Sequence, residues 1–516
     1  MTSKEVHFKL QNQNTIQPQV LATGCHFTPQ PAHSSVHLVK QKRALMVIGF
    51  PAVLLQANRT LARPLARPLT SLLACLLPCL LVCLLLSACG GKSAITDISS
   101  RGEVADLKNF PQNLTVFAEQ AGGNKPLLTQ AQQNEQASRY KTTFYRPWTM
   151  TKSTFSKKDA AWAIKNFSGK QSYTASGELM PPDTWVKHAD NANIKNFPSL
   201  AWKGIIIANA PLRALPTSTP YYLNPKKPGE GYPFDYLAYT SLWVGTPVFV
   251  SHVSNDRAWL FCETALLSGW VPASAVAAVS DNFIARWQAM PLGAVLSDNI
   301  PLPGASASKE NRLRIGTLLP MQNGNLLVPV RQGQTTSWQP VSAPMGSAGL
   351  FPVNISPNAI AALGNQMMGE PYGWGGVDFN RDCSSMLRDI YTPFGIWLPR
   401  NSSKQIQVGQ GIDISAMNDA AKLRAIRDFG EPFLTLIGMP GHVMLYVGSY
   451  QMSDGQSQIA VFHDIWGART QLNSGQQGRL IMGKVVVTSL TPAGEYPEVQ
   501  RAGTLLNKLK IVTVLP

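Results

Sequence analysis

Residues 69–86 form an almost unbroken apolar run, and this run decides how much of the chain is available to fold into a globular protein. Arg59, Arg63 and Arg67 precede it, and small residues and a cysteine follow it directly. Basic residues, an apolar stretch and a small-residue cleavage site are the layout of a secretory signal. The alternative is an uncleaved membrane-spanning helix, since the run approaches the roughly 20 residues that cross a bilayer, but an internal proline argues against it.

The motif Leu86-Ser87-Ala88-Cys89 resembles the bacterial lipobox, in which the chain is cut before the cysteine and the cysteine is acylated. We therefore expect residues 1–88 to be a precursor segment and Cys89 to be the lipidated N-terminus of an exported protein. Met46 is an alternative start. An aspartate directly after the lipidated cysteine resembles an inner-membrane retention signal in bacteria with two membranes. This chain has Gly90 at that position, so we expect an anchor in the outer membrane, facing the periplasm.

Positive charge is concentrated in the predicted precursor segment. The chain of 516 residues has a formal charge of +16, but residues 1–88 hold eight Lys or Arg against one acid, Glu5, which leaves +9 for the rest. This small excess of positive charge suits contact with anionic envelope polymers or an ordinary solvated surface, and it does not indicate nucleic-acid binding. The length predicts roughly three or four domains.

The part after Cys89 begins with polar segments. Residues 90–100 are short, small and polar, which suits a tether. Residues 119–138 are rich in Gln, Asn and Gly, which predicts loops. Residues 140–200, with Trp148 and a helix-like stretch at 157–167, predict a small irregular domain.

Two sets of short strands follow. The motifs Gly269-Trp270-Val271-Pro272 and Gly349-Leu350-Phe351-Pro352 end the two sets and lie 80 residues apart. The predicted strands are residues 248–250 and 259–262 in the first set, and residues 326–330 and 338–341 in the second. This repetition predicts two small all-β barrels in tandem.

Cys262 and His252 lie in the first predicted barrel. Cys262 falls in an alternating strand, which makes it most simply a small core residue, and we expect His252 to be structural. One thiol and one imidazole do not make a metal site, and no Cys-x-x-Cys or His-Glu-x-x-His spacing occurs in the chain. The complete phosphate-binding motif, Gly-x-x-x-x-Gly-Lys followed by Ser or Thr, is also absent, so we expect neither a metal nor a cofactor.

Cys383 is predicted to begin a helix. Residues 357–367 form an earlier helical pattern that starts with Pro357, and the glycine-rich turn 372–376 follows. After Cys383, apolar residues recur at helical spacing through Tyr391. Free backbone N–H groups and the positive end of the dipole at such a helix start stabilise a thiolate, which is the nucleophilic form of cysteine.

Two histidines are predicted on neighbouring strands. His442 opens one strand, and residues 459–464 form its partner after a tight turn. Across this hairpin His463 can bond one ring nitrogen of His442 and present the other to Cys383. Asp464 faces the opposite side of an ideal strand and takes this role only if the strand has a bulge. A Cys nucleophile, a His base and an orienting polar group suffice for thiol acyl transfer.

The choice of nucleophile and base is narrow after the precursor segment. Beyond residue 88 the chain contains Cys89, Cys262, Cys383, His188, His252, His442 and His463 as its cysteines and histidines. In an oxidising envelope Cys262 and Cys383 can also pair as a disulfide, which the sequence does not exclude.

Several motifs resemble the NlpC-type (NlpC/P60) family of cell-wall cysteine peptidases. They are Tyr372-Gly373-Trp374-Gly375-Gly376, Arg381-Asp382-Cys383-Ser384, Leu398-Pro399-Arg400-Asn401-Ser402 with Gln405, and Gly441-His442-Val443. The barrels resemble the paired bacterial SH3-like domains of one branch of that family. Residues 140–200 resemble its N-terminal stabilising domain more weakly.

The resemblance implies an α+β multidomain protein with a papain-like C-terminal catalytic domain, two SH3-like barrels before it and a small N-terminal domain. The expected boundaries are 1–88 for the precursor, 89–139 for the lipidated Cys and tether, 140–200 for the N-terminal domain, 201–282 and 283–355 for the barrels, 356–490 for the catalytic domain and 491–516 for a C-terminal extension.

The resemblance also implies an activity, the hydrolysis of the bond from γ-D-glutamate to the diamino acid in peptidoglycan stem peptides. By position, Cys383 matches the nucleophile, His442 the base and His463 the third polar residue, although 21 residues separate the histidines, more than in compact members. The positions that match substrate-binding residues are Tyr372, Asp382, Ser384, Arg400 and Ser402.

Two of these positions have two interpretations. Asp382 suits the free ammonium of a substrate, or it caps the helix. Tyr372 is an oxyanion or substrate donor, or a packed aromatic. If the first barrel folds over the cleft, as it does in the branch that the chain resembles, it closes the subsites beyond a terminal L-alanine, and peptides with a free N-terminal L-alanine are preferred.

The expected partners are peptidoglycan stem peptides and, through Cys89, a membrane. Two other functions compete with hydrolysis. A thiol amidase or acyltransferase on the same scaffold needs a different acceptor pocket. A non-catalytic lipoprotein that binds the wall has no need of the Cys and His set, which argues against it.

Overall fold

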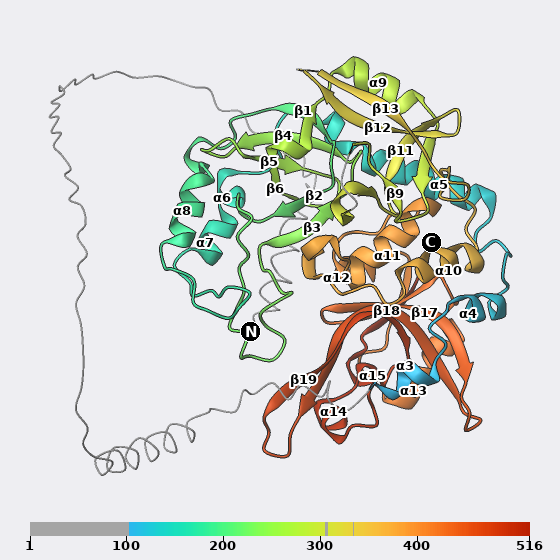
Figure 1. Cartoon of the computed structure of the whole chain (residues 1–516). Coiled ribbons are helices and arrows are strands. Elements are labelled where there is room, and N and C mark those ends of the chain that lie inside the picture. The colour runs from blue at the N-terminus through green and yellow to red at the C-terminus, as the bar shows by residue number, and fades with distance from the viewer. Residues whose placement is uncertain (1–102, 305–307, 334) are drawn as a thin grey trace, which may run out of the picture. The chain divides into compact units, whose positions relative to one another are not determined.

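The computed structural model describes residues 103–304, 308–333 and 335–516. The predicted signal segment, Met46 and Cys89 lie outside these residues, so the lipoprotein hypothesis stays a prediction. The described chain runs from N-terminal helices through all-β parts to a mixed C-terminal domain, which confirms the α+β multidomain fold class (Figure 1). In the described ranges, no helix is both long and apolar enough to cross a membrane.

The N-terminal part is helical. Its helices are α3 (Ala105–Asn109), α4 (Thr115–Gln120), α5 (Gln130–Phe144), η3 (Arg146–Thr149), α6 (Lys157–Ala160), α7 (Trp162–Phe167), α8 (Thr184–Asn191) and η4 (Ile194–Asn196). The prediction of a tether through residue 139, with loops at 119–138, is therefore wrong for residues 103–139. Leu114 and Phe117 are fully buried in a core that they share with the C-terminal domain.

Helix α5 was missed because few of its residues are apolar. Thr129 accepts a hydrogen bond from the backbone N–H of Gln132, and the Gln132 side chain accepts one from the backbone N–H of Thr129, which is a capping box. Only Gln133, Ala137 and Tyr140 on this helix are buried. A stripe this narrow does not stand out among Gln and Asn, because its burial depends on neighbours far along the chain.

The first barrel is a seven-stranded antiparallel sheet. Its elements are β1 (Trp202–Ile206), β2 (Ala210–Arg213), β3 (Ala238–Leu242), β4 (Pro247–Val253), β5 (Trp259–Glu263), β6 (Ser268–Pro272), η5 (Ala273–Ala275) and β7 (Val276–Ala278), and its strand order is β3-β2-β6-β5-β4-β1-β7. The two strands predicted here are confirmed as parts of β4 and β5. A long connection, residues 214–237, joins β2 to β3.

Cys262 and His252 of the first barrel have structural roles, as predicted. Cys262 is fully buried in the barrel core. Nδ1 of His252 lies 2.7 Å from the Ser199 hydroxyl, and Nε2 lies 3.1 Å from the Asn193 carbonyl, so the ring is satisfied inside the fold.

The second all-β part is a five-stranded sheet with one covering helix. Its elements are α9 (Asp281–Ala289), β8 (Leu292–Val295), β9 (Ile300–Pro301), η6 (Lys309–Asn311), β10 (Arg312–Leu313), β11 (Leu318–Gln322), β12 (Asn325–Gln332), β13 (Thr335–Ser342) and β14 (Ala348–Leu350). The sheet order is β13-β12-β11-β8-β14, and β9 and β10 pair separately. The predicted strands are confirmed within β12 and β13. Ser280 caps α9, which packs Phe283 and Trp287 against Trp338.

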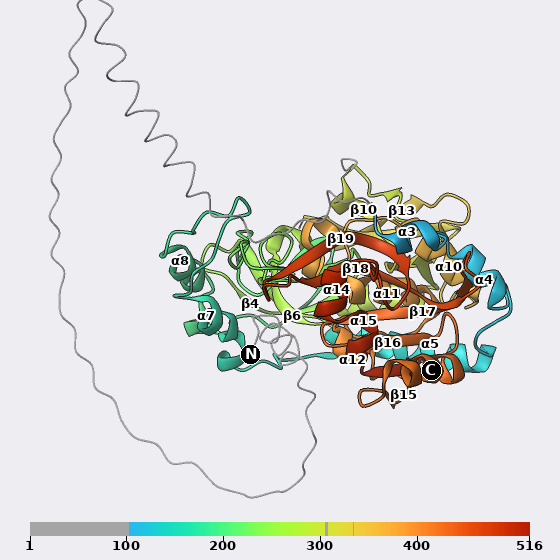
Figure 2. The same cartoon turned by 90° about the horizontal axis from the view of Figure 1, so that it is seen from below.

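The C-terminal domain combines helices with a six-stranded antiparallel sheet (Figure 2). Its elements are α10 (Pro357–Met367), η7 (Trp374–Phe379), α11 (Cys383–Tyr391), η8 (Thr392–Phe394), α12 (Ser402–Gln405), β15 (Gln410–Asp413), α13 (Asp419–Phe429), β16 (Thr435–Met439), β17 (His442–Gln451), β18 (Ser457–Gln471), β19 (Gln477–Thr488), α14 (Pro497–Ala502), α15 (Leu505–Lys508) and β20 (Ile511–Val514). The strand order is β15-β20-β16-β17-β18-β19. The predicted helices at 357–367 and after Cys383, and the predicted hairpin, are confirmed.

The last residues are part of this sheet. Strand β20 lies between β15 and β16, and Val512 is fully buried. The prediction that residues 491–516 are an extension is therefore wrong. Three apolar residues and a threonine do not reveal that they pair with strands about 75 and 100 residues earlier.

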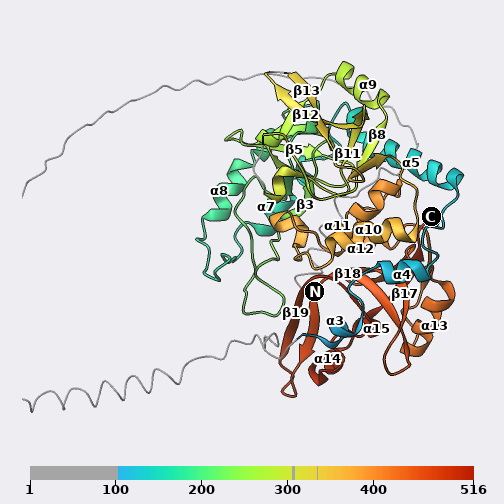
Figure 3. The same cartoon turned by 45° about the vertical axis from the view of Figure 1, so that its right-hand side comes forward.

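Helix α11 lies between strand β3 of the first barrel and strands β17 and β18, as the views in Figures 1 and 3 agree. The glycine-rich turn before it packs directly on β3. A Cβ atom on Gly375 would lie 2.2 Å from the Ala238 carbonyl oxygen, and one on Gly376 would lie 2.6 Å from the Ser241 nitrogen. Both glycines also have positive φ, so this contact requires glycine at both positions.

Candidate active site

Helix α11 begins at Cys383 because Asp382 caps it. The Asp382 side chain accepts a hydrogen bond from the backbone N–H of Ser385, and the Ser385 hydroxyl accepts one from the backbone N–H of Asp382. The helix buries Met386 and Leu387 in the core beneath the sheet. Cys383 is therefore held in the first turn, and its side chain is only 5% exposed.

The two predicted histidines meet beside this cysteine. Nε2 of His442 lies 2.9 Å from Nδ1 of His463, so the expected contact across the hairpin is present. The backbone N–H of Val443, the residue after His442, hydrogen-bonds to the Cys383 sulfur. The second nitrogen of His463, Nε2, lies 3.0 Å from the Thr488 hydroxyl at the end of β19. The catalytic roles of these residues stay predictions.

Asp464, the alternative partner for His442, makes no such contact. Both of its carboxyl oxygens are buried and have no hydrogen-bond partner among the described residues. Burial raises the pKa of Asp464 well above its ordinary value, and the nearby Asp382 and Glu370 act in the same direction. Burial therefore disfavours the charged form of Asp464.

Burial sets the resting protonation state of the site. Burial raises the pKa of the Cys383 thiol to about 12, the Asp382 carboxylate adds to the rise, and the hydrogen bond from Val443 opposes it. Burial lowers the pKa of His442 to about 4 and holds the pKa of His463 well below its ordinary value. Burial of the thiol thus opposes the thiolate that the helix start was expected to favour, because it removes the charged form from water.

Asp382, Ser384 and Arg400 form one buried cluster. The Arg400 guanidinium donates to the two Asp382 carboxylate oxygens at 3.1 and 2.6 Å, and to the Ser384 hydroxyl at 2.8 Å. The backbone N–H of Gly375 also donates to Asp382 at 3.1 Å. Burial alone would raise the pKa of Asp382, but the charge and hydrogen bonds of Arg400, with the hydrogen bonds from Ser385 and Ser384, outweigh it and lower this pKa to about 2. Helix capping is thus one role of Asp382, and ammonium binding stays a prediction.

Tyr372 lies where the first barrel meets the C-terminal domain. Its ring centroid is 6.2 Å from that of Phe234, in the connection between β2 and β3, and 5.9 Å from that of Trp466 on β18. Burial holds the pKa of Tyr372 well above its ordinary value, and nearby Cys383 and Asp382 add to this, so its hydroxyl stays a donor. Ser402 begins α12 and is partly buried.

Three segments of the chain match models of known domains. Residues 78–197 match the NLPC_P60 stabilising domain, residues 220–272 match an SH3 domain of the SH3b1 type, and residues 369–471 match the NlpC/P60 family. The last segment contains Cys383, His442 and His463. The C-terminal part of the chain is an NlpC/P60 domain. Members of this family are in general cysteine peptidases.

Known proteins resemble the chain to different extents. A structure of a novel NlpC/P60 endopeptidase from Photobacterium damselae subsp. piscicida has 26% identity and a TM-score of 0.72, and the match covers 79% of this chain and 97% of that one. A γ-D-glutamyl-L-lysine dipeptidyl-peptidase of Bacillus cereus is 31% identical over 90 residues, which are 17% of this chain and 25% of that relative. An NlpC/P60 family protein structure from Bacillus cereus has 18% identity and a TM-score of 0.38, covering 61% of this chain and all of that one.

The approach of the SH3-like barrel to the NlpC/P60 site was expected, but the residues that make it were not identified from the sequence. Phe234, Trp374 and Trp466 pack together, with ring centroids 5.3 and 5.4 Å from that of Phe234. The Tyr232 hydroxyl in the same connection donates to Asp378 of η7 at 2.8 Å. Single aromatic residues in loops carry no periodic pattern, so only the packing of the two domains identifies them.

An ionic cluster fixes Arg381, two residues before the cysteine of the NlpC/P60 domain. Its guanidinium donates to Asp298 of the second barrel at 2.6 and 3.0 Å and to Asp389 of α11 at 2.8 Å. The indole N–H of Trp243, in the first barrel, donates to the same Asp389 at 3.2 Å. Both barrels therefore help to hold the start of α11.

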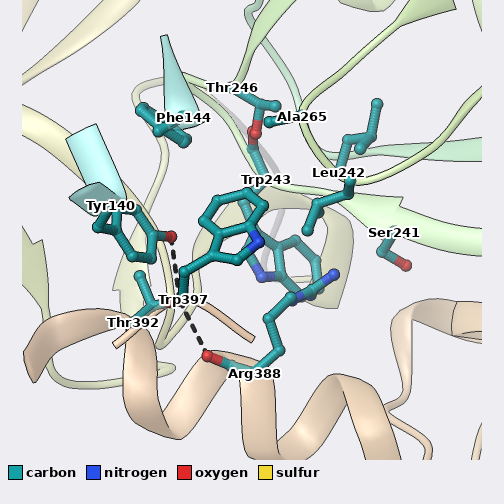
Figure 4. Close-up of a pocket in the computed structure, with 12 residues that line it drawn as sticks. Tyr140, Phe144, Ser241, Leu242, Trp243, Thr246, Ala265, Arg388, Thr392 and Trp397 are labelled. Atoms are coloured by element: carbon teal, nitrogen blue, oxygen red, sulfur yellow. Dashed lines mark hydrogen bonds between the residues drawn. The ribbon is translucent and has the colours of Figure 1, made fainter. Parts of the chain in front are cut away.

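A small cavity lies at the other end of α11. It is lined by aromatic residues that include Tyr140, Trp243 and Trp397, with Arg388 and Thr392 of the NlpC/P60 domain (Figure 4). Its volume of about 40 Å³ holds little more than a water molecule, so it offers no room for a peptide.

Cys262 and Cys383 are both free thiols. Across the described ranges, no group of three metal-binding side chains is close enough to hold an ion.

Proposed function

We propose that this protein is a peptidoglycan stem-peptide hydrolase that cuts the bond from γ-D-glutamate to the diamino acid, with Cys383 as nucleophile, His442 as base and His463 as the residue that orients the base. The observation that carries this proposal is the cysteine at the start of α11 beside the hydrogen-bonded pair His442 and His463. The NlpC/P60 and SH3b-type domains support a peptidoglycan substrate. The names of the two relatives, an endopeptidase and a γ-D-glutamyl-L-lysine dipeptidyl-peptidase, support the bond type.

In the resting site the Cys383 thiol and the His442 imidazole are both uncharged, so the proposed reaction starts from a neutral pair. His442 takes the thiol proton while the Cys383 sulfur bonds to the γ-carbonyl carbon, so no stable thiolate is needed beforehand. The carbonyl oxygen becomes an oxyanion, which the backbone N–H of Cys383 and the Tyr372 hydroxyl stabilise. The imidazolium then gives its proton to the amine of the diamino acid as the C–N bond breaks.

Hydrolysis of the resulting thioester completes the cycle. His442 takes a proton from water while the water oxygen bonds to the carbonyl carbon. The sulfur leaves and recovers the proton from the imidazolium. The products are a peptide that ends in D-glutamate and a peptide that begins with the diamino acid.

Digestion of purified muropeptides followed by mass spectrometry tests this proposal. Cys383→Ala should abolish cleavage between D-glutamate and the diamino acid and leave the circular dichroism spectrum unchanged. Cys262→Ala, a matched change of a buried thiol in the first barrel, should leave the rate within about twofold. Cleavage at another bond, transfer to an added amine in place of water, or activity in the Cys383 variant would each refute it.

Substrate selection is the finer part of the proposal. The first barrel packs Phe234 against Tyr372 and Trp466, which supports closure of the cleft on the side of the substrate N-terminus. Peptides with a free N-terminal L-alanine should then fit better than stems joined to muramic acid. Asp382 is the proposed partner of the free ammonium, sharing its charge with Arg400.

We also propose that the protein is anchored to the envelope by lipid on Cys89, in the outer membrane and facing the periplasm. The support is the sequence of residues 69–89 alone. Cys89→Ala should stop the incorporation of labelled fatty acid, while Cys83→Ala, a change inside the apolar run, should not. Continued labelling of the Cys89 variant would refute the anchor.

A further inference from the structure

The hydrogen-bond distances around His463 favour one direction for the bonds. The Thr488 hydroxyl donates to the carbonyl oxygen of Ser489 at 2.7 Å, and a carbonyl can only accept. This bond is the shorter of the two and takes the single hydroxyl proton, so toward His463 the Thr488 oxygen acts as an acceptor. At 3.0 Å, Nε2 of His463 then carries the proton.

The proton position on His463 determines that on His442. A neutral imidazole protonated on Nε2 has an unprotonated Nδ1, which accepts hydrogen bonds. Nδ1 of His463 lies 2.9 Å from Nε2 of His442, so this nitrogen of His442 donates. The remaining nitrogen of His442, Nδ1, then has a free lone pair. The low pKa of both histidines keeps the rings neutral near pH 7, as this alternation requires.

The chain of bonds is fixed at its far end by the N-terminal helices. One carboxylate oxygen of Asp106, in the first turn of α3, accepts from the backbone N–H and the hydroxyl of Ser489, each at 2.7 Å. These bonds hold the peptide that follows Thr488. His463 and Thr488 are both fully buried, so water does not replace a lost partner there.

We propose that Thr488 is a positioning residue: its hydroxyl sets the tautomer of His463, and through it that of His442, so that Nδ1 of His442 is free to take the thiol proton. The consequence for the reaction rests on the proposed function, whereas the tautomers themselves do not. Thr488 touches neither the substrate nor the sulfur, and it acts only through the two rings.

Replacing the hydroxyl by a methyl group tests this proposal. In Thr488→Val, Nε2 of His463 loses its acceptor, and the ring gains more by protonating Nδ1. Nδ1–H of His463 then faces Nε2–H of His442, and two donors cannot bond to each other. His442 relieves this by moving its proton from Nε2 to Nδ1, which is the nitrogen that should act as base. We expect kcat to fall about 10- to 100-fold with KM within about twofold, and Thr488→Ser to recover most of the rate.

A control and a spectroscopic measurement separate positioning from a merely structural effect. Thr470 on β18 is 2% exposed, and its hydroxyl has no hydrogen-bond partner among the described residues, so Thr470→Val removes a buried hydroxyl without affecting the chain of bonds. The nitrogen chemical shifts of ¹⁵N-histidine in the full chain report the tautomers without any substrate. We expect Nε2–H forms for His442 and His463 in the native protein, and Nδ1–H for His463 in Thr488→Val.

Each result decides the proposal. If His463 keeps Nε2–H in Thr488→Val, or if Thr470→Val lowers kcat equally, the positioning role is wrong. If Thr488→Ser fails to recover activity, the role is also wrong. If the tautomers change as expected but the native protein cleaves no muropeptide, the hydrogen-bond chain stands and the proposed function fails.

Discussion

At the scale of single residues, burial has more effect on the protonation states of the candidate site than the neighbouring residues in the sequence do. His442 has a pKa of about 4 and the Cys383 thiol one of about 12. The form that starts the proposed reaction needs a neutral imidazole, which exists above the His442 pKa and is lost as the pH falls through it. We therefore expect kcat/KM to stay level from about pH 6 to 7, below the range in which the substrate's N-terminal ammonium loses its proton, and to fall only below about pH 5.

The measurement is a pH profile of kcat/KM up to about pH 7 with a stem peptide whose carboxyl groups outside the site are amidated, so that neither these carboxyl groups nor the N-terminal ammonium titrates in this range. A fall centred near pH 6.5, the ordinary value for histidine, would contradict the neutral, buried site. Circular dichroism at each pH distinguishes loss of activity from unfolding.

The pair of Arg400 and Asp382 gives a second prediction at this scale. Their side chains are 1% and 8% exposed. Arg400→Met leaves a buried carboxylate without its cation, which should destabilise the C-terminal domain by about 3–5 kcal/mol in urea denaturation. Asp382→Asn in the same chain should recover part of the loss.

The matched control is Lys187→Met. It breaks an ion pair with Asp183 whose side chains are 74% and 61% exposed, and solvent screens such exposed pairs, so we expect little change in the free energy of unfolding. Equal losses from Arg400→Met and Lys187→Met would mean that burial of the Arg400 pair is not what stabilises the domain.

At the scale of elements, the C-terminal strand β20 completes the sheet that carries the histidines. It pairs with β15 on one side and with β16 on the other. Removing residues 510–516 should expose the edge of β16, lower the unfolding temperature of the domain and abolish activity. Removal of Pro516 alone, which is exposed and lies beyond β20, should change neither. An active, equally stable chain without residues 510–516 would contradict this.

At the scale of the whole molecule, both barrels contact the part of the NlpC/P60 domain that carries the candidate site. A free tetrapeptide should be cut much faster than the same stem joined to muramic acid, because the connection that carries Phe234 packs against Tyr372 at one side of the site. Phe234→Ala should reduce the difference between the rates on the free and the muramic-acid-linked peptide, because it opens the side of the site that Phe234 closes. Phe283→Ala, which removes a buried aromatic residue of the second barrel, should leave the ratio of rates unchanged.

Rates on the two purified substrates, compared as kcat/KM, measure this selection. Equal rates in the native protein would remove both the closure of the cleft and the ammonium role of Asp382. A loss of activity on both substrates in Phe234→Ala, with an unchanged ratio, would assign Phe234 to packing and not to selection.

The sequence by itself determined the elements whose patterns are local. The helix that begins at Cys383, the hairpin that brings His442 to His463 and the short strands of both barrels follow from residue periodicity, turns and caps, which act over a few residues. The order of the domains followed in the same way, because each domain has its own run of such patterns.

Only the tertiary structure decided what depends on distant neighbours. The helices of residues 103–144 and strand β20 have short or weak apolar patterns. The helices pack against the C-terminal domain hundreds of residues later, and β20 pairs with strands about 75 and 100 residues earlier. The neutral thiol of Cys383 and the chain of bonds from His442 through His463 to Thr488 are equally out of reach of the sequence. Desolvation and the direction of a hydrogen bond depend on which groups surround an atom, and packing of the whole chain fixes those surroundings.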